Sequence, residues 1–178
     1  MEGSKKLVLG ASAVIMLLSE AAMAQQSKPC SDPVFDDFDF WVGEWDVTGA
    51  DGKFAGTNSI TKEEYGCLLV ERWTNASGIT GQSYNFVDLV TGQWRQVWVS
   101  AGATIDYSGG LNEDGAMALE GVIGYPAGTA GSGAQFRGTW TPNKNGTVKQ
   151  HFQQYDPSKD EWTDWFVGTY KRRETPKP

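Results

Sequence analysis

The chain has 178 residues, and its 22 acidic side chains outnumber its 15 basic ones, so the formal net charge is −7. Nucleic-acid grooves need clusters of Lys and Arg that pair with phosphates. The one basic cluster here, 171–173 with Lys177, lies at the C-terminus and reads as the solvated end of a strand. The charge balance therefore argues against a nucleic-acid partner.

The first 24 residues have the pattern of a secretory signal peptide. Lys5 and Lys6 form a positive region, 7–18 is apolar, and Ala22-Met23-Ala24 matches a small-x-small cleavage site. The apolar run is shorter than the ~20 residues that span a bilayer, although a retained helical anchor is the alternative. We expect a periplasmic or secreted mature chain that begins near Gln25, spans no membrane and forms one domain.

Two cysteines, Cys30 and Cys67, follow the leader. In an oxidising compartment an isolated pair most often forms one disulfide. Such a bridge would tie an N-terminal arm, 25–38, to the start of a strand.

From Asp39 onward the sequence alternates apolar and polar residues between short turns rich in Gly, Asn and Asp, which predicts β-strands. The connections have hairpin length, and no long segment repeats every 3.6 residues, so successive strands should pair in an antiparallel meander. Closing that meander into a barrel removes its edges, whereas a two-sheet sandwich is the structural alternative. The expected strands are 39–48, 54–62, 67–75, 79–88, 93–100, 103–111, 115–125, 134–141, 147–155 and 162–171.

The predicted fold class is thus all-β, an up-and-down antiparallel barrel of about ten strands over residues 39–171, followed by a tail, 172–178. One connection, Gly124–Gly133, is longer and richer in glycine than the others. It could act as a lid over the barrel or be an ordinary surface loop.

The alternation also sorts side chains by face. In the first strand, Trp41, Gly43, Trp45 and Val47 share a face without charge, which should point inward.

The same reasoning predicts a ligand pocket on three later strands, lined by Glu71, Trp73, Asn85, Gln96 and Trp98. A mostly apolar cavity with a few polar groups is typical of small-molecule sites. The alternative is that Glu71 points to water and the tryptophans cover the outer surface. Exposing pairs of Trp side chains to water would be costly, which disfavours this alternative.

Few residues suggest catalysis. His151 is the only histidine, and a single His cannot form a His-rich metal site, so we expect no metal and no cofactor. Glu71 in an apolar cavity could act as an acid or base, and Glu71 and His151 are therefore the catalytic candidates. The acidic run Asp36, Asp37 and Asp39 is expected to be solvated.

Three segments together resemble a family of exported bacterial proteins of unknown function near the calycin superfamily. They are Phe38–Val47, with its Phe-x-Phe-x-x-Gly-x-Trp, Gly66–Trp73 with its Gly-Cys, and Asn85–Trp94. The resemblance covers about residues 36–171 and implies a lipocalin-like barrel, but it implies no chemistry.

The closing pattern of the chain also resembles the nitrobindins, a distant calycin branch. Those proteins bind haem through a His in the last strand, a few residues before a Thr-aromatic pair. Here the pair is Thr169-Tyr170, and Trp165 stands where that His would lie. The resemblance therefore does not extend to haem binding.

Three functions are compatible with these features. The first is an exported barrel that binds a small hydrophobic or aromatic molecule. The second is a calycin-type enzyme, an isomerase, cyclase or lyase, that uses Glu71. The third is a structural module with a packed interior. The fold alone does not choose among them.

Overall fold

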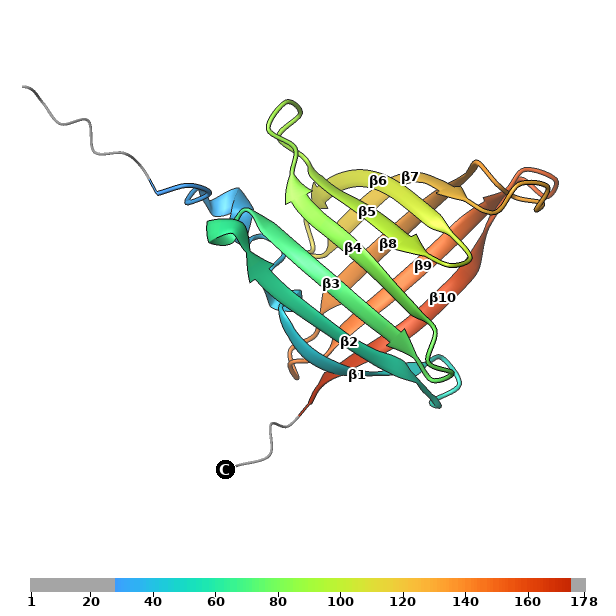
Figure 1. The fold of residues 1–178 in the computed structure, drawn as a ribbon, viewed down its shortest axis with the longest axis horizontal. Helices are drawn as coiled ribbons and strands as arrows, with labels where there is room; N and C mark the ends of the chain where they lie inside the picture. Colours follow the sequence, from blue (N-terminus) through green and yellow to red (C-terminus); the bar gives the residue numbers. More distant parts are fainter. Residues whose placement is uncertain (1–27, 174–178) are drawn as a thin grey trace, which may run out of the picture.

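The computed structural model describes residues 28–173, which form a closed ten-stranded antiparallel barrel (Figure 1). Each strand pairs with its neighbours in sequence, and β1 pairs with β10 to close the ring, as the sequence predicted. The predicted signal peptide, 1–24, lies outside the described residues. The strands are β1 (Gly43–Gly49), β2 (Phe54–Glu63), β3 (Leu68–Asn75), β4 (Thr80–Val87), β5 (Trp94–Ser100), β6 (Thr104–Leu111), β7 (Met117–Gly124), β8 (Ala134–Pro142), β9 (Val148–Asp156) and β10 (Glu161–Arg172).

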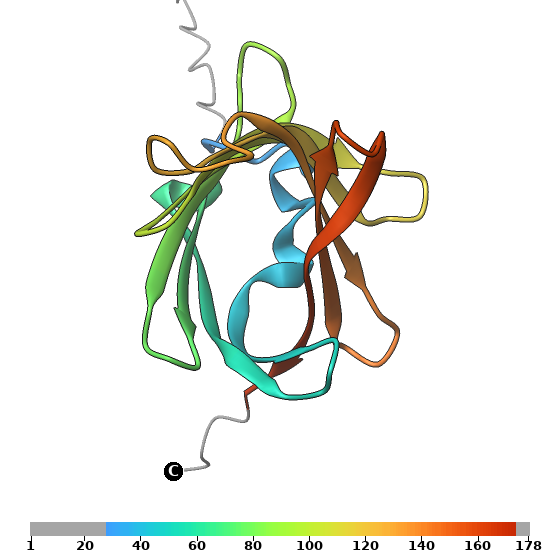
Figure 2. The same ribbon diagram turned by 90° about the vertical axis from the view of Figure 1, so that its right-hand side faces the viewer.

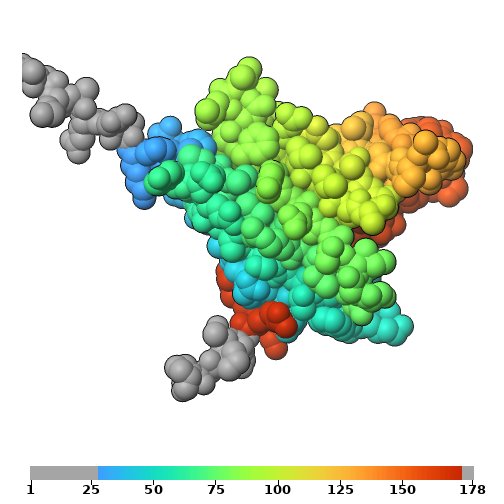
Figure 3. Space-filling view, viewed as in Figure 1, coloured from blue at the N-terminus to red at the C-terminus, as the bar shows by residue number. Residues whose placement is uncertain are grey.

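The hairpin connections use the turn chemistry that their residues favour. In the β6–β7 turn, Asn112 Oδ1 accepts hydrogen bonds from the backbone N–H groups of Asp114 (3.0 Å) and Ala116 (2.9 Å). Gly115 in the same turn has a φ of 75°, which favours glycine. Several connections project from the barrel as separate lobes, among them the β4–β5 connection, 88–93, at the top of Figure 3.

The sequence predicted a first strand that begins at Asp39, and this start is wrong. The N-terminal segment forms two short 3₁₀ helices, η1 (Pro33–Asp36) and η2 (Asp39–Trp41), and β1 starts at Gly43. Phe35, Phe38 and Trp41 are spaced by three residues, the period of a 3₁₀ turn, and all three are buried. We call 33–41 the plug, because Figure 2 shows both helices inside the ring of strands.

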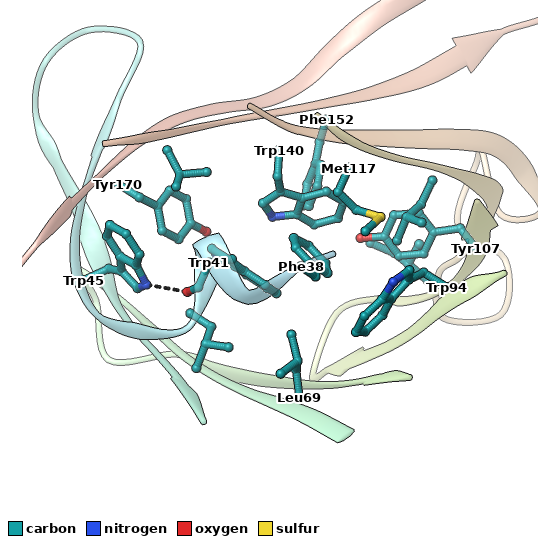
Figure 4. Close-up of a cluster of buried hydrophobic side chains, with 14 of the residues drawn as sticks. Phe38, Trp41, Trp45, Leu69, Trp94, Tyr107, Met117, Trp140, Phe152 and Tyr170 are labelled. Carbon is teal, nitrogen blue, oxygen red and sulfur yellow. Dashed lines mark hydrogen bonds between the residues drawn. The ribbon is translucent and has the colours of Figure 1, made fainter. Parts of the chain in front are cut away.

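The plug is the centre of the aromatic core (Figure 4). The Phe38 ring stacks on Trp41, with centroids 4.9 Å apart, and meets Trp140 edge-on at 5.2 Å. Trp45 Nε1 donates a hydrogen bond to the carbonyl of Trp41 (2.8 Å). Aromatic side chains therefore fill this end of the barrel.

Covalent and polar contacts fasten the plug to the wall. The predicted disulfide between Cys30 and Cys67 is present, with 5.2 Å between the two Cα atoms. Cys67 ends the third 3₁₀ turn, η3 (Glu64–Gly66), just before β3. Lys62 on β2 donates hydrogen bonds to Asp36 (2.6 Å) and Asp39 (2.7 Å), so two of the three clustered carboxylates anchor the plug instead of being fully solvated.

Within residues 28–173 no helix has both the length and the apolar character to cross a membrane.

Candidate functional site

A cavity of about 270 Å³ lies inside the barrel, toward the end away from the plug. Its rim includes Ala55 near the start of β2, Asn75 at the end of β3 and Trp165 near the start of β10, which are strand ends remote from η1 and η2. Its lining comes from six strands and consists of Ala55, Glu71, Trp73, Asn75, Gln96, Trp98, Ile105, Gln150, Phe152, Trp165, Phe166 and Tyr170.

Aromatic rings form most of the wall. Trp73 on β3 meets Phe166 on β10 edge-on, with ring centroids 6.4 Å apart. Phe152 on β9 lies 6.2 Å from Trp165 and 6.4 Å from Phe166. The cavity thus offers several ring faces and edges to a bound molecule, which suits a flat or apolar ligand.

The indole of Trp98 lies over Gly81, its diagonal neighbour on β4. A Cβ atom at position 81 would come within 2.2 Å of Trp98 Cζ2, so only glycine leaves room for the ring in this position. The sequence therefore sets the orientation of Trp98 through a residue on the adjacent strand.

A β-bulge in β10 supplies two further wall residues. Asp164 pairs with Gln153 and Phe166 pairs with Phe152, so Trp165 is an extra residue without a partner on β9. A regular strand would direct Trp165 and Phe166 to opposite faces, whereas the bulge lets both line the cavity. Strict alternation could not have found this pair.

Glu71 is the only acidic or basic residue of the lining apart from the phenol of Tyr170. The Glu71 side chain is 4% exposed, and it accepts hydrogen bonds from Asn58 Nδ2 (2.7 Å) and Ser83 Oγ (2.6 Å). Burial raises the pKa of Glu71 to about 7, because these two hydrogen bonds offset only part of the desolvation. The carboxyl is therefore about half ionised near neutral pH.

A chain of hydrogen bonds leads to Glu71 from the β5–β6 side. Asn85 Nδ2 donates to the Leu69 carbonyl (3.1 Å), which can only accept, and this contact fixes the amide orientation. Tyr107 then donates to Gln96, Gln96 to Asn85, Asn85 to Ser83, and Ser83 to Glu71. Every donor in the chain points toward the carboxylate.

On the other side of the carboxylate, Asn58 Nδ2 also donates to the Tyr170 hydroxyl (3.3 Å), which donates to Gln150 Oε1 (2.8 Å). Asn58 Oδ1 is buried and has no hydrogen-bond partner among residues 28–173. One acceptor next to Glu71 thus remains unused.

The five residues expected to form a pocket divide into two groups. Glu71, Trp73, Gln96 and Trp98 line the cavity. Asn85 does not: it pairs with Gln96 on β5 and with Leu69 on β3, two residues closer to the plug than Glu71, and is fully buried. Asn85 acts on the cavity only through its hydrogen bonds.

The other catalytic candidate, His151, lies outside the cavity. On β9 the inward positions are Gln150 and Phe152, and His151 between them faces outward. Its Nε2 atom lies 2.6 Å from Asp164 Oδ1 on β10. His151 therefore cannot act together with Glu71 on one bound molecule.

The long β7–β8 connection touches the rim. Tyr125 in this connection donates from its hydroxyl to Gln154 Oε1 (2.7 Å) and accepts a hydrogen bond from Trp165 Nε1 (3.0 Å). The connection is thus linked to one wall of the cavity.

The part of the chain that the structure describes contains no group of three or more His, Cys, Asp or Glu side chains placed to hold a metal ion. Neither the family models nor the curated proteins include a match to this chain. The family resemblance of the opening motif stays a prediction, and the cavity itself has to indicate the function.

Proposed function

We propose that this chain is an exported binding protein that holds one small hydrophobic or aromatic molecule in the cavity between Trp73, Trp98 and Trp165. The observation that carries the proposal is the asymmetry of the barrel interior. Aromatic side chains fill the plug end, whereas the other end keeps a cavity of about 270 Å³ with an aromatic wall and few polar groups.

The cavity argues against the third function, a structural module with a packed interior. Protein interiors are close-packed and hold few voids larger than one water molecule. The space of about 270 Å³ is many times the volume that one water molecule needs. Without a ligand, water would have to cover its aromatic wall.

The decisive experiment is native mass spectrometry of the protein purified from its own host, compared with the same sample after mild denaturation and refolding. We expect a mass increment of a small molecule in the first sample and none in the second. Absence of any increment, together with no change of tryptophan fluorescence across a panel of small aromatic compounds, would contradict the proposal.

A second candidate function is supported by Glu71. A carboxyl with a pKa near 7 facing an apolar cavity is suited to transfer a proton in either direction, so a calycin-type isomerase, cyclase or lyase is the enzymatic alternative. If the chain is an enzyme, a co-purified compound should be converted by the wild-type protein and not by Glu71→Gln. A binding protein returns the compound unchanged in both cases.

A further inference from the structure

The charge of Glu71 has no counterpart inside the barrel. None of the residues that line the cavity within 28–173 is Lys, Arg or His. The next residue, Arg72, faces outward and pairs with Glu63 (3.3 Å). The charge of Glu71 acts on the phenols of Tyr107 and Tyr170, whose pKa values are raised well above their usual range first by burial and then by this charge. Both stay neutral at physiological pH.

An ionised carboxylate buried without a cation is costly, because hydrogen bonds from neutral groups replace only part of its hydration. A neutral ligand would leave this cost in place. An anionic ligand would add a second negative charge to the same small volume. Protonation removes this penalty at low pH, but where Glu71 is ionised a cation is the one ligand charge that removes it.

The surrounding rings favour the same charge. Trp73, Trp98 and Trp165 contribute to the wall, and the faces of indole rings attract cations. Each Glu71 oxygen accepts one hydrogen bond from the protein and keeps a lone pair for another donor. An ammonium group has three N–H donors and no acceptor, which matches these unused acceptors.

We propose that the ligand is a small amine with an apolar or aromatic body, whose ammonium group pairs with Glu71 while its body lies among the tryptophans. This inference rests on the proposed binding function and names the chemical class of its ligand. The cavity volume limits the body to about one or two rings, too small for a long-chain lipid.

Three probes of nearly equal size test the charge: 2-phenylethylamine, 2-phenylethanol and 3-phenylpropionate, titrated at pH 8 with tryptophan fluorescence as the signal. We expect the amine to bind about tenfold or more tightly than the alcohol and the acid to bind most weakly. In Glu71→Gln the amine should lose this advantage. Glu120→Gln, on an exposed position of β7, is the matched control and should keep it.

A second measurement needs no variant. Because burial raises the pKa of Glu71 to about 7, part of the Glu71 carboxyls carry a proton at pH 7, and pairing with an ammonium group should release that proton to the buffer. Calorimetric titration of the wild-type protein in two buffers of different ionisation enthalpy should show more proton release with the amine than with the alcohol.

Equal binding of amine and alcohol, tighter binding of the acid, or an amine advantage that survives in Glu71→Gln would each overturn the amine assignment while leaving the proposed binding function intact. If neither the amine nor the alcohol binds, the amine assignment is overturned as well. The mass-spectrometric experiment above then decides the binding function separately.

Discussion

At the scale of single residues, Glu71 controls the character of the site. It is a buried carboxyl held by two neutral donors, and its pKa of about 7 lies well above its ordinary value of 4.5. The folded state therefore binds a proton more tightly than the unfolded chain does. Ionising Glu71 in the folded state therefore lowers the stability of the protein.

This difference predicts how stability depends on pH. Because the folded pKa is raised, the stabilising effect is complete below pH 4.5 and is lost as the pH rises through about 7. The loss over this window should reach about 3 kcal/mol, from ~1.4 kcal/mol per pKa unit. Urea unfolding at pH 5, 6, 7 and 8 should show this slope in the wild type and a nearly flat line in Glu71→Gln. Equal slopes in the two proteins would contradict the prediction.

Trp98 should contribute directly to ligand binding, because it lines the cavity and Gly81 holds its ring in place. Trp98→Ala should weaken binding of an aromatic ligand by ~1–3 kcal/mol, the scale of one buried aromatic contact. Trp162→Ala is the matched control, since Trp162 lies under Arg137 and does not line the cavity. Fluorescence or calorimetric titration measures both, and an equal effect of the two variants would refute a specific role for Trp98.

At the scale of elements, the plug decides which end of the barrel is filled. Its aromatic residues recur every three positions, and the disulfide, Lys62 and a hydrogen bond from Trp94 Nε1 to the Val34 carbonyl (3.0 Å) hold it. No residue of the plug lines the cavity.

The disulfide should stabilise the fold mainly by restricting the unfolded chain. For a sequence separation of 37 residues, the chain-entropy estimate is ~3–4 kcal/mol. Cys30→Ser with Cys67→Ser should lose about this much free energy of unfolding, and reduced wild-type protein should behave alike. Thiol labelling of unfolded, unreduced protein should detect no free cysteine, and two labelled thiols per chain would disprove the bridge in solution.

The bulge in β10 predicts an unusual tolerance to deletion. Removing Trp165 joins the Asp164–Gln153 and Phe166–Phe152 pairs into a regular ladder, so the protein should fold and lose only the contacts of one indole. Deleting Tyr84 from β4, whose ladders with β3 and β5 contain no bulge, shifts half of that strand out of register and should prevent folding. Circular dichroism and thermal unfolding compare the two, and equal damage would show that the bulge is not where the structure has it.

At the scale of the whole molecule, closure depends on the last strand. The β1–β10 ladder runs from the Trp45–Arg172 pair to the Gly49–Gly168 pair, and without it both strands become unprotected edges. The cavity wall would open as well, because Tyr170 belongs to this ladder and to the lining.

A pair of truncations tests this dependence. Ending the chain after Arg173 keeps the complete ladder and should leave the thermal midpoint almost unchanged. Ending it after Val167 removes the β10 side of the ladder and should abolish the cooperative transition and promote association of the exposed edges. A cooperative, monomeric protein without 168–178 would show that closure is not needed for stability.

The sequence by itself determined the order of the strands and the inward faces of most of them. Hairpin connections are local, so turn residues indicate where each strand ends. The alternation of side chains with a period of two assigns Leu69 and Glu71, or Trp94 and Gln96, to one face of the sheet. The disulfide followed from the presence of only two cysteines.

Three features were decided only by the tertiary structure: the 3₁₀ plug at Asp39–Trp41, the bulge at Trp165 and the position of Asn85 below the cavity. Alternation reports which face a residue occupies, but neither its depth along the barrel axis nor where the period breaks. Whether an inward residue lines the cavity or lies beneath it depends on which segment fills the barrel, and that is settled by packing between residues far apart in the chain.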